Sequence, residues 1–295
     1  MAEPLSVAVR RGEIVESTHR VHAVAVRDGA VVAAAGDPQL LSSLRSAAKP
    51  IQALPLARAR EDLTEDELAI AAASHFGTEL HVEAVRALLR KTGGSEEELD
   101  CGLQDGRPPE PIYHNCSGKH SGMIAVCRER GWPVEGYRRP DHPLQRELVE
   151  EVAAAAEISP RDVATATDGC GVVCFGLPLE RVANAFSRFE RLEGGDRITA
   201  AMRARPILVG GEGATDTKLM QTLPGWIAKG GAEGLLCAAS ADGLGLALEV
   251  EDGGSRALRP ALAEFAARLG LELSAFPEVT LQNSHGETVG TIAAS

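Results

Sequence analysis

A serine and a lysine three positions apart give this sequence its first chemical signal. Ser46 and Lys49 lie in the string Arg-Ser-Ala-Ala-Lys-Pro at residues 45–50, and on a helix this spacing places both side chains on one face. A serine hydroxyl is a good nucleophile only when a base takes its proton. A buried lysine can be that base because burial favours its neutral form. The small apolar residues around Lys49 predict such burial, although the same spacing also occurs on ordinary surface helices.

A second polar cluster follows an apolar run at residues 68–73. Ser74 and two histidines surround a glycine within residues 74–81. One interpretation is a second part of an active site. The other is a helix cap, in which Ser74 or Thr78 starts a helix near Glu79 and the histidines are solvated.

A third cluster, Tyr-His-Asn-Cys-Ser-Gly-Lys-His-Ser-Gly at residues 113–122, has almost no apolar content and is followed by an apolar run at 123–127. This order predicts a polar loop that enters a buried helix. Helix N-termini bind anions and stabilise developing negative charge on oxygen. The alternative is a glycine-rich turn with incidental polar side chains.

Two of the six cysteines lie in polar or glycine-rich segments. Cys116 belongs to the third cluster, and Cys170 stands between two glycines in residues 168–172. The two thiols are possible co-ligands for a soft metal such as zinc, or they are simply buried thiols. Lys229 precedes a glycine pair that leads into a strand, similar to the Lys-Thr-Gly strand of penicillin-recognising enzymes. A literal Lys-Thr-Gly at residues 91–93 is expected to end a helix instead.

The elements that must hold these residues follow from hydrophobic periodicity and turn signals. Strands are expected over residues 6–36, with a hairpin turn at Asp28-Gly29, and over 233–250 around residues 241–243. The C-terminal end is also β-prone. Helices are expected over residues 46–60, 64–73, 79–91, 142–156, 178–190, 195–203 and 256–269. Strands at both ends and a helix-rich middle predict an α+β sandwich of an antiparallel sheet with helices, as one domain over residues 1–295.

Composition narrows the function classes. The chain has 295 residues, a formal net charge of -12 and only 3 % aromatic residues, which argues against nucleic acid and anionic membranes as partners. No apolar run approaches the roughly 20 residues that span a bilayer. The first residues lack the pattern of a signal peptide, so a cytoplasmic enzyme is expected. A homodimer is expected because it is the commonest soluble assembly.

Together these segments resemble the bacterial-type L-asparaginases of the asparaginase II superfamily, the rhizobial inducible type, and not the asparaginases with a threonine nucleophile. The matching segments keep their order and span about two thirds of the chain. They are Arg45-Ser46-x-x-Lys49-Pro50-x-Gln52, Ser74-His75-x-Gly77-x-x-x-His81, His114-Asn115-Cys116-Ser117-Gly118-Lys119-His120, Pro140-Asp141-His142-Pro143, Asp168-Gly169-Cys170-Gly171 and Lys229-x-Gly231-Ala232-Glu233-Gly234.

The resemblance implies a fold similar to serine β-lactamases and penicillin-binding proteins. It also implies deamidation of L-asparagine to L-aspartate and ammonia. By motif match, Ser46 would be the nucleophile and Lys49 its base. Ser74 and Lys229 would form a second Ser–Lys pair.

The resemblance further implies one zinc ion held by Cys116, Lys119 and Cys170. Lysine is an unusual ligand because it must lose its proton to offer a lone pair. Since Ser46 and Lys49 already supply nucleophile and base, the zinc is expected to organise the substrate.

Arg45, His120 and Asp168 would lie around the substrate. One departure from the family pattern is visible. The family pattern implies a glycine-rich stretch with an arginine before an Asp-Thr pair, but this chain has Gly210-Gly211-Glu212-Gly213-Ala214-Thr215-Asp216-Thr217 there.

Two other functions remain as alternatives. A β-lactamase-like or peptidase-like serine acyltransferase would ordinarily work outside the cytoplasm, and the missing signal-peptide pattern argues against it. A non-catalytic, zinc-bound amino-acid sensor would not need the Ser46–Lys49 spacing.

Overall fold

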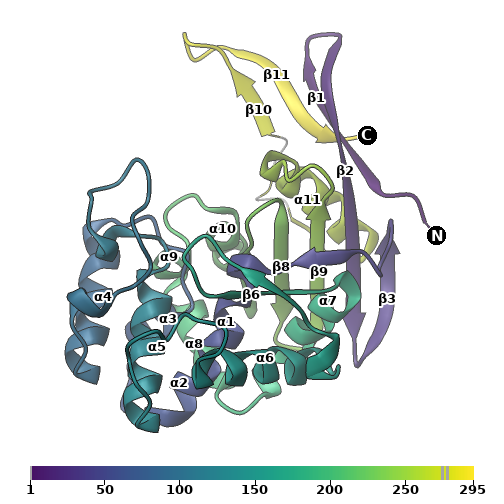
Figure 1. Cartoon of the computed structure of the whole chain (residues 1–295). Coiled ribbons are helices and arrows are strands. Elements are labelled where there is room, and N and C mark those ends of the chain that lie inside the picture. Colours follow the sequence, from purple (N-terminus) through teal and green to yellow (C-terminus); the bar gives the residue numbers. More distant parts are fainter. Residues whose placement is uncertain (1, 274–275, 277–278) are drawn as a thin grey trace.

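A large antiparallel sheet joins the two ends of the chain. In the computed structural model, which describes residues 2–273, 276 and 279–295, its strands run in the order β10-β11-β1-β2-β9-β8-β7, and β3 also pairs with β2. Because β1 lies between β11 and β2, the first and last strands are neighbours (Figure 1). The strands are β1 Leu5–Arg11, β2 Ile14–Arg27, β3 Ala30–Ala35, β7 Trp226–Gly230, β8 Leu235–Ser240, β9 Leu244–Val250, β10 Val279–Gln282 and β11 Thr288–Ala294.

Two predicted hairpin turns are present. Asp28 and Gly29 both have positive φ, 50° and 77°, as a tight turn between antiparallel strands requires. Residues 241–243 connect β8 to β9, and Gly243 has φ 86°. The predicted α+β class, an antiparallel sheet with helices, is confirmed.

The helices fill the middle of the chain. Among the described residues, no helix is both long and apolar enough to cross a bilayer. The α-helices are α1 Lys49–Gln52, α2 Leu54–Ala59, α3 Glu65–Ala71, α4 Glu79–Thr92, α5 Ser117–Arg130, α6 Pro143–Ala156, α7 Leu179–Arg188, α8 Gly195–Ala204, α9 Pro206–Val209, α10 Thr215–Thr222 and α11 Leu258–Arg268.

The helix expected over residues 46–60 is divided into three pieces. A 3-10 helix covers Arg45–Ala48, and α1 and α2 follow it. Pro50 and Pro55 each lie in the first turn of their helix, where proline is tolerated because it has no N–H to donate. Further along, Gly93 ends α4 with φ 72°, so the Lys-Thr-Gly string at 91–93 is a helix end, as expected.

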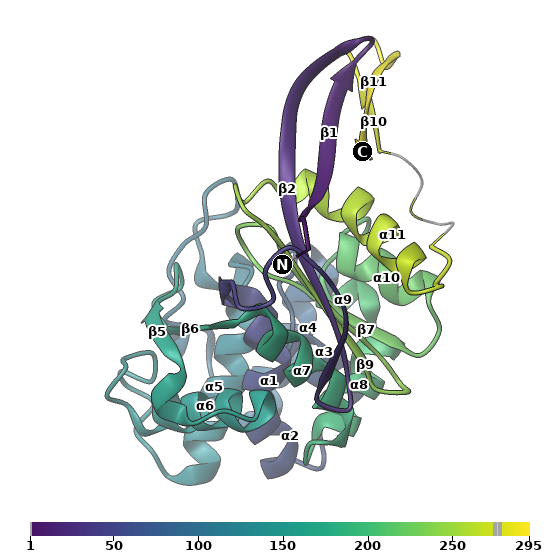
Figure 2. The same ribbon diagram turned by 90° about the vertical axis from the view of Figure 1, so that its right-hand side faces the viewer.

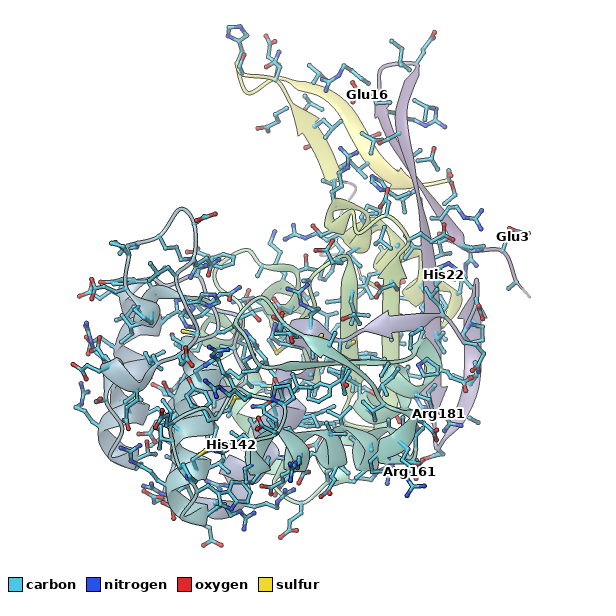
Figure 3. The ribbon with its side chains drawn as sticks, in the orientation of Figure 1. Glu3, Glu16, His22, His142, Arg161 and Arg181 are labelled. Carbon is cyan, nitrogen blue, oxygen red and sulfur yellow. The ribbon has the colours of Figure 1, made fainter. Side chains whose placement is uncertain are left out.

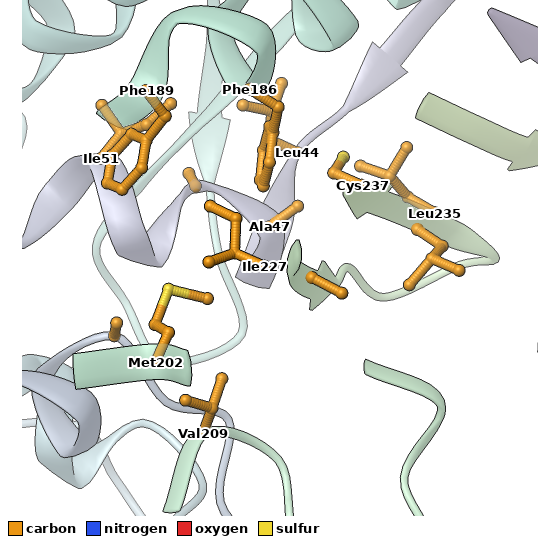
Figure 4. Close-up of a cluster of buried hydrophobic side chains, with 14 of the residues drawn as sticks. Leu44, Ala47, Ile51, Phe186, Phe189, Met202, Val209, Ile227, Leu235 and Cys237 are labelled. Carbon is orange, nitrogen blue, oxygen red and sulfur yellow. The ribbon is translucent and has the colours of Figure 1, made fainter. Parts of the chain in front are cut away.

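Helices cover both faces of the sheet. A side chain at Gly245 in β9 would collide with the backbone of α7, so this face of β9 packs directly on that helix. The alternate residues of β9 are also buried, and α11 packs against β9, β1 and β11. Figure 4 shows the core where Leu44 and Ala47 meet Phe186 and Ile227. The segment that carries Ser46 is therefore anchored on both sides by buried apolar residues.

A small second sheet was not predicted. Its strands β4 Leu41–Ser43, β6 Val173–Pro178 and β5 Ala164–Thr167 lie in that order. Strands β4 and β5 have three and four residues, which gives too little periodicity for recognition. Leu44 N–H donates to Phe175 O at 2.8 Å, so the sheet ties the start of the Ser46 segment to the strand that follows Cys170.

The polar segment at residues 113–122 enters its helix earlier than expected. The prediction of a polar loop before the helix is wrong for residues 117–121, which are already helical and buried. The reason is close packing of α5 on α3. A Cβ atom at Gly118 would collide with the carbonyl oxygen of Ile70, so only glycine permits this approach.

Part of the sheet projects beyond the helices. Both views show the turn between β1 and β2, together with β10 and β11, extending away from the helical body (Figures 1 and 2). Glu16 lies on this projection, whereas His22, further along β2, lies where the strand enters the body (Figure 3). Arg11 donates to Glu16 at 2.7 Å on the exposed part. Ile14 is two-thirds exposed there.

Two glycines on α5 make a matched test of the packing on α3. Gly118→Ala should lower the free energy of unfolding by about 1–3 kcal/mol because the backbone of Ile70 cannot move aside. Gly122→Ala, one turn later, should be near neutral because its Cβ would meet side-chain carbons at 3.2 and 3.4 Å and alanine favours the helix. Urea unfolding of both variants measures the difference; equal stabilities would contradict this packing.

Candidate active site

The Lys49 amine is completely buried and is held by three oxygen atoms. Its Nζ donates to Ala73 O at 2.7 Å, to Ser74 Oγ at 2.9 Å and to Asn115 O at 3.1 Å. These acceptors come from the segment after α3 and from the segment before α5. None of the three is a carboxylate, so within the described part of the chain this amine donates its hydrogen bonds to neutral oxygens.

The environment of Lys49 makes it a candidate base. Burial lowers its pKa to about 8, and the positive charges of Lys119 and Lys229 add to this effect, although Cys116 opposes it. About a tenth of Lys49 is therefore neutral at pH 7, far more than for an exposed lysine.

Ser46 lies one 3-10 turn before Lys49. The N–H of Lys49 donates to the carbonyl of Ser46, and in a 3-10 helix the side chains at positions i and i+3 eclipse each other. The predicted common face is therefore present, although the helix type differs. Lys49 Nζ donates its hydrogen bond to Ser74 Oγ, while Ser46 is half-buried.

Arg45 and Asp168 form an ion pair at the same site. Arg45 Nε donates to Asp168 Oδ1 at 2.5 Å, and the carboxylate is largely buried. Arg45 has φ 43°, a left-handed conformation that is uncommon for a residue with a Cβ and that marks sites where geometry is imposed. The structure thus brings together two of the three residues expected around the substrate.

Lys229 has its own carboxylate. It lies inside β7, and its Nζ donates to Asp216 Oδ2 at 3.4 Å and to Gly230 O at 3.0 Å. Gly230 N–H donates to the same carboxylate oxygen at 3.1 Å. Ser74 accepts a hydrogen bond from Lys49, and Asp216 supplies a counter-ion for Lys229; the second Ser–Lys pair of Ser74 and Lys229 stays a prediction. Burial of the Lys229–Asp216 pair between β7 and α10 was invisible in the sequence.

Gly231 allows β7 to approach the 3-10 helix that carries Ser46. A Cβ at this position would lie 2.9 Å from the carbonyl oxygen of Leu44, which immediately precedes Arg45. A glycine here allows the strand that carries Lys229 to pack directly against the 3-10 helix.

Two sulfurs and an amine meet beside this cluster. Lys119 Nζ donates to Cys170 Sγ at 3.1 Å, and Cys116 Sγ donates to Asn115 Oδ1 at 3.1 Å. Interaction between the two thiols lowers the pKa of Cys116 well below its usual range and, together with burial, raises the pKa of Cys170. Burial alone would lower the pKa of Lys119, but Cys116, Cys170 and Asp168 raise it to about 12.

The donor set fits a zinc ion. Tetrahedral zinc with ordinary bond lengths would hold a sulfur and a nitrogen ligand about 3.6 Å apart, so Lys119 Nζ and Cys170 Sγ, which lie 3.1 Å apart, would separate slightly to bind it. Among the described residues, no three His, Cys, Asp or Glu side chains form a possible metal site. A metal here would therefore depend on the lysine amine, which must first lose its proton.

His120 lies one helical turn after Cys116 and is completely buried. Its Nδ1 lies 2.6 Å from Tyr137 Oη. Burial lowers the pKa of His120 well below its usual range, and the charge of Lys119 adds to this effect. His120 is therefore neutral, and Tyr137 is a partner that the sequence did not reveal.

The two histidines of the second cluster are buried, and the interpretation that they are solvated is wrong. His75 Nε2 lies 2.9 Å from Ser117 Oγ, and His81 Nε2 lies 2.9 Å from Ile207 O. The two rings stack at 5.3 Å. Thr78 does occupy the cap position of α4, but its hydroxyl contacts His81 Nδ1 at 2.6 Å and makes no cap hydrogen bond.

A match to a protein-family model identifies the family of the chain. The model of L-asparaginase II matches residues 7–294. The chain belongs to the L-asparaginase II family. The resemblance carried by the ordered motifs is thereby confirmed.

Comparisons at lower similarity add no functional argument for this L-asparaginase II family member. No curated protein matches the chain. Among solved structures, native Mglu in 4.3 M NaCl is similar with a TM-score of 0.49 and 14 % identity over 86 % of this chain and 62 % of that one. This chain thus spans less than two thirds of Mglu.

Two further matches are described as β-lactamases. A putative β-lactamase from Bacteroides dorei DSM 17855 has a TM-score of 0.47 and 15 % identity over 84 % of this chain and 93 % of that one. A β-lactamase from Mycobacterium bovis has a TM-score of 0.39 and 18 % identity over 84 % of this chain and 94 % of that one. At these TM-scores the matches carry no inference about chemistry.

The lowered pKa of Lys49 should make the free energy of unfolding depend on pH. Between about pH 8 and pH 10.5, the unfolded chain holds a proton on this lysine that the folded chain has lost. Stability attributable to Lys49 should therefore rise with pH in this window, by roughly 3 kcal/mol in total. Below pH 8 both states are protonated and the contribution is constant.

Urea unfolding across this window tests the prediction. The wild type should gain stability relative to Lys49→Met, while Lys218→Met, at a partly exposed lysine on α10, should follow the wild type. Parallel curves for the wild type and Lys49→Met would show that Lys49 keeps an ordinary pKa.

Proposed function

We propose that the protein is an L-asparagine amidohydrolase in which Ser46 forms an acyl-enzyme and Lys49 is the base. Membership of the L-asparaginase II family supports the reaction class. The observation that carries the mechanism is the Lys49 amine, which is fully buried among neutral oxygens and has a pKa lowered to about 8. Such a lysine is neutral often enough to accept a proton near neutral pH.

The contacts of Lys49 suggest the path of that proton. A neutral amine has two N–H groups and one lone pair, and the carbonyls of Ala73 and Asn115 can only accept hydrogen bonds. The lone pair must therefore face Ser74, whose hydroxyl can donate. We propose that Ser74 relays the proton from Ser46 to Lys49.

In the proposed reaction Ser46 Oγ attacks the side-chain amide carbon of asparagine, and its proton reaches Lys49 Nζ. The C–N bond then breaks, the proton passes to the leaving nitrogen, and ammonia departs. A water molecule attacks the ester, loses its proton to Lys49 and releases aspartate. Ser46 recovers its proton from Lys49, so both groups return to their starting states.

The Arg45–Asp168 pair is suited to a zwitterionic substrate. A guanidinium can bind the α-carboxylate, and a carboxylate can bind the α-ammonium group. Holding both α-groups fixes the distance from them to the scissile amide. L-glutamine, with one extra methylene, would carry its carbonyl past the nucleophile, so L-asparagine is the proposed substrate. Ala214, in place of the expected arginine, leaves Arg45 as the proposed carboxylate ligand.

We further propose that Cys116, Lys119 and Cys170 hold one zinc ion when the metal is bound. The metal would supply a fixed positive centre that helps to orient the substrate. The residues themselves keep Asp168 in place, because Lys119 Nζ lies 4.0 Å from its carboxylate and Cys170 Sγ lies 3.8 Å from it.

Ammonia release from L-asparagine tests the proposed function. Ser46→Ala should abolish turnover apart from a small residual rate over water, and it should form no aspartyl-enzyme detectable by mass spectrometry. Ser74→Ala should slow turnover but still acylate at Ser46. Ser43→Ala, at an exposed serine on β4, is the matched control and should be fully active.

Other outcomes of the same assay separate the alternatives. An acyl-enzyme on Ser74 would exchange the proposed roles of the two serines. Equal kcat/KM for L-asparagine and L-glutamine would contradict the substrate assignment. Hydrolysis of a β-lactam without any release of ammonia from L-asparagine would favour the acyltransferase alternative.

Metal analysis tests the zinc proposal. One zinc per chain is expected, with affinity that falls as pH drops because protons compete for all three ligands. Cys170→Ser should lose the metal and raise KM more than it lowers kcat. Cys127→Ala, at a buried cysteine on the same helix as Lys119, should keep it. Metal-free protein with full activity would contradict the proposal, and loss of kcat alone would assign the metal a chemical role.

A further inference from the structure

The His120 ring has one nitrogen with a partner and one without. Nδ1 lies 2.6 Å from Tyr137 Oη, whereas the buried Nε2 has no hydrogen-bond partner among the described residues. The ring lies in the helix turn that also carries Cys116 and Lys119, within electrostatic reach of Lys49. A buried polar atom without a partner is uncommon in a folded protein and calls for an explanation.

The hydroxyl of Tyr137 decides where the histidine proton is. Tyr137 Oη accepts a hydrogen bond from Asp100 N–H at 2.9 Å. The hydroxyl proton of Tyr137 then has one hydrogen-bond acceptor among the described residues, Nδ1 of His120. Burial also raises the pKa of Tyr137, so the phenol keeps this proton. The His120 proton must accordingly sit on Nε2.

Tyr137 is itself held firmly in position. Its carbonyl accepts from Gln145 Nε2 at 2.9 Å, and Gln145 Oε1 accepts from Val173 N–H at 3.2 Å. The Tyr137 and His120 rings pack edge to face with centroids 5.4 Å apart. The tyrosine therefore connects the turn of α5 that carries His120 to the strand that follows the Cys170 loop.

We infer that Tyr137 is a positioning residue that holds His120 as its Nε2–H tautomer, so that this N–H donates to an oxygen atom of the bound amide substrate. The identity of that ligand rests on the proposed function. An Nε2 that carries a proton has no lone pair for a metal, so His120 would complement the zinc ligands without joining them. The bound substrate would supply the hydrogen-bond acceptor for Nε2–H, because the described residues supply none.

Tyr137→Phe removes the hydroxyl and keeps the aromatic ring. Nitrogen NMR of the full chain, purified with 15N-labelled histidine, reports which ring nitrogen is protonated without any need for activity. The His120 signals are assigned by their loss in His120→Gln. The wild type should show a single tautomer with the proton on Nε2, and Tyr137→Phe should show a mixture or the opposite tautomer.

Kinetics with L-asparagine test the role of the Nε2–H group. Tyr137→Phe should raise KM about three- to tenfold, the range of one lost neutral hydrogen bond, with a smaller change in kcat. His120→Gln places an amide N–H near the position of Nε2 and should bind substrate better than His120→Asn, which cannot reach it. This ranking would not follow from a merely structural role.

Arg138→Gln is the structural control. Arg138 Nε donates to Asp100 Oδ2 at 2.5 Å, so its loss loosens the same backbone that contacts Tyr137 but leaves the hydroxyl on His120. This variant should keep the wild-type tautomer and a nearly unchanged KM. If Arg138→Gln raised KM as much as Tyr137→Phe does, Tyr137 would act only by holding the backbone of Asp100.

The NMR and kinetic experiments can contradict this inference independently of the proposed function. A wild-type signal with the proton on Nδ1, or an unchanged signal in Tyr137→Phe, overturns the inference whether or not the enzyme hydrolyses asparagine. A confirmed tautomer with KM unchanged in both Tyr137→Phe and His120→Asn overturns the donor role. If L-asparagine is not a substrate, the tautomer prediction still stands and the KM series is run with the amide that is.

Discussion

Burial of the Lys49 ammonium, without a carboxylate partner among the described residues, is the constraint on which the site depends. Removing a charge from water is costly unless protein groups replace the lost hydration, and here Ala73 O, Ser74 Oγ and Asn115 O do so. These oxygens belong to separate segments, so α3 and α5 must meet closely at this point. The contact of Gly118 with the backbone of Ile70 permits that approach. Packing of two helices thus sets the chemistry of one amine.

Three buried lysines in this region have different surroundings and therefore different proposed roles. Lys229 faces the carboxylate of Asp216. Lys119 faces two sulfurs and Asp168, which raise its pKa to about 12. Lys49 faces neutral oxygens, and its pKa is lowered to about 8. The pKa of the same side chain is thus raised at Lys119 and lowered at Lys49 according to its neighbours.

The remainder of the fold brings distant segments to this cluster. The small sheet of β4, β6 and β5 ties the Ser46 segment to the strand after Cys170, while β7 carries Lys229 to the same place from the large sheet. Tyr137 and Gln145 bridge α5 and β6 by buried hydrogen bonds. Buried polar contacts of this kind restrict how these elements pack, because each buried donor or acceptor left without a hydrogen bond would cost free energy.

The sequence by itself determined the class of fold, the long periodic helices, the hairpin at Asp28-Gly29 and the family. These features follow from local patterns, namely hydrophobic spacing, turn residues and ordered motifs. It also singled out Ser46, Lys49 and the cysteines, because their residue types are unusual in such apolar or glycine-rich surroundings. Short strands such as β4 and β5 escaped because they contain too few residues to show a period.

Only the tertiary structure decided which of these side chains touch. Ser74 contacts Lys49, and Asp216 reaches Lys229 from α10. Tyr137 lies 17 positions from His120 in a segment without any motif, so no local signal could have revealed their contact. Partner choice among buried polar groups depends on the packing of distant elements, and that information is not present in the spacing along the chain.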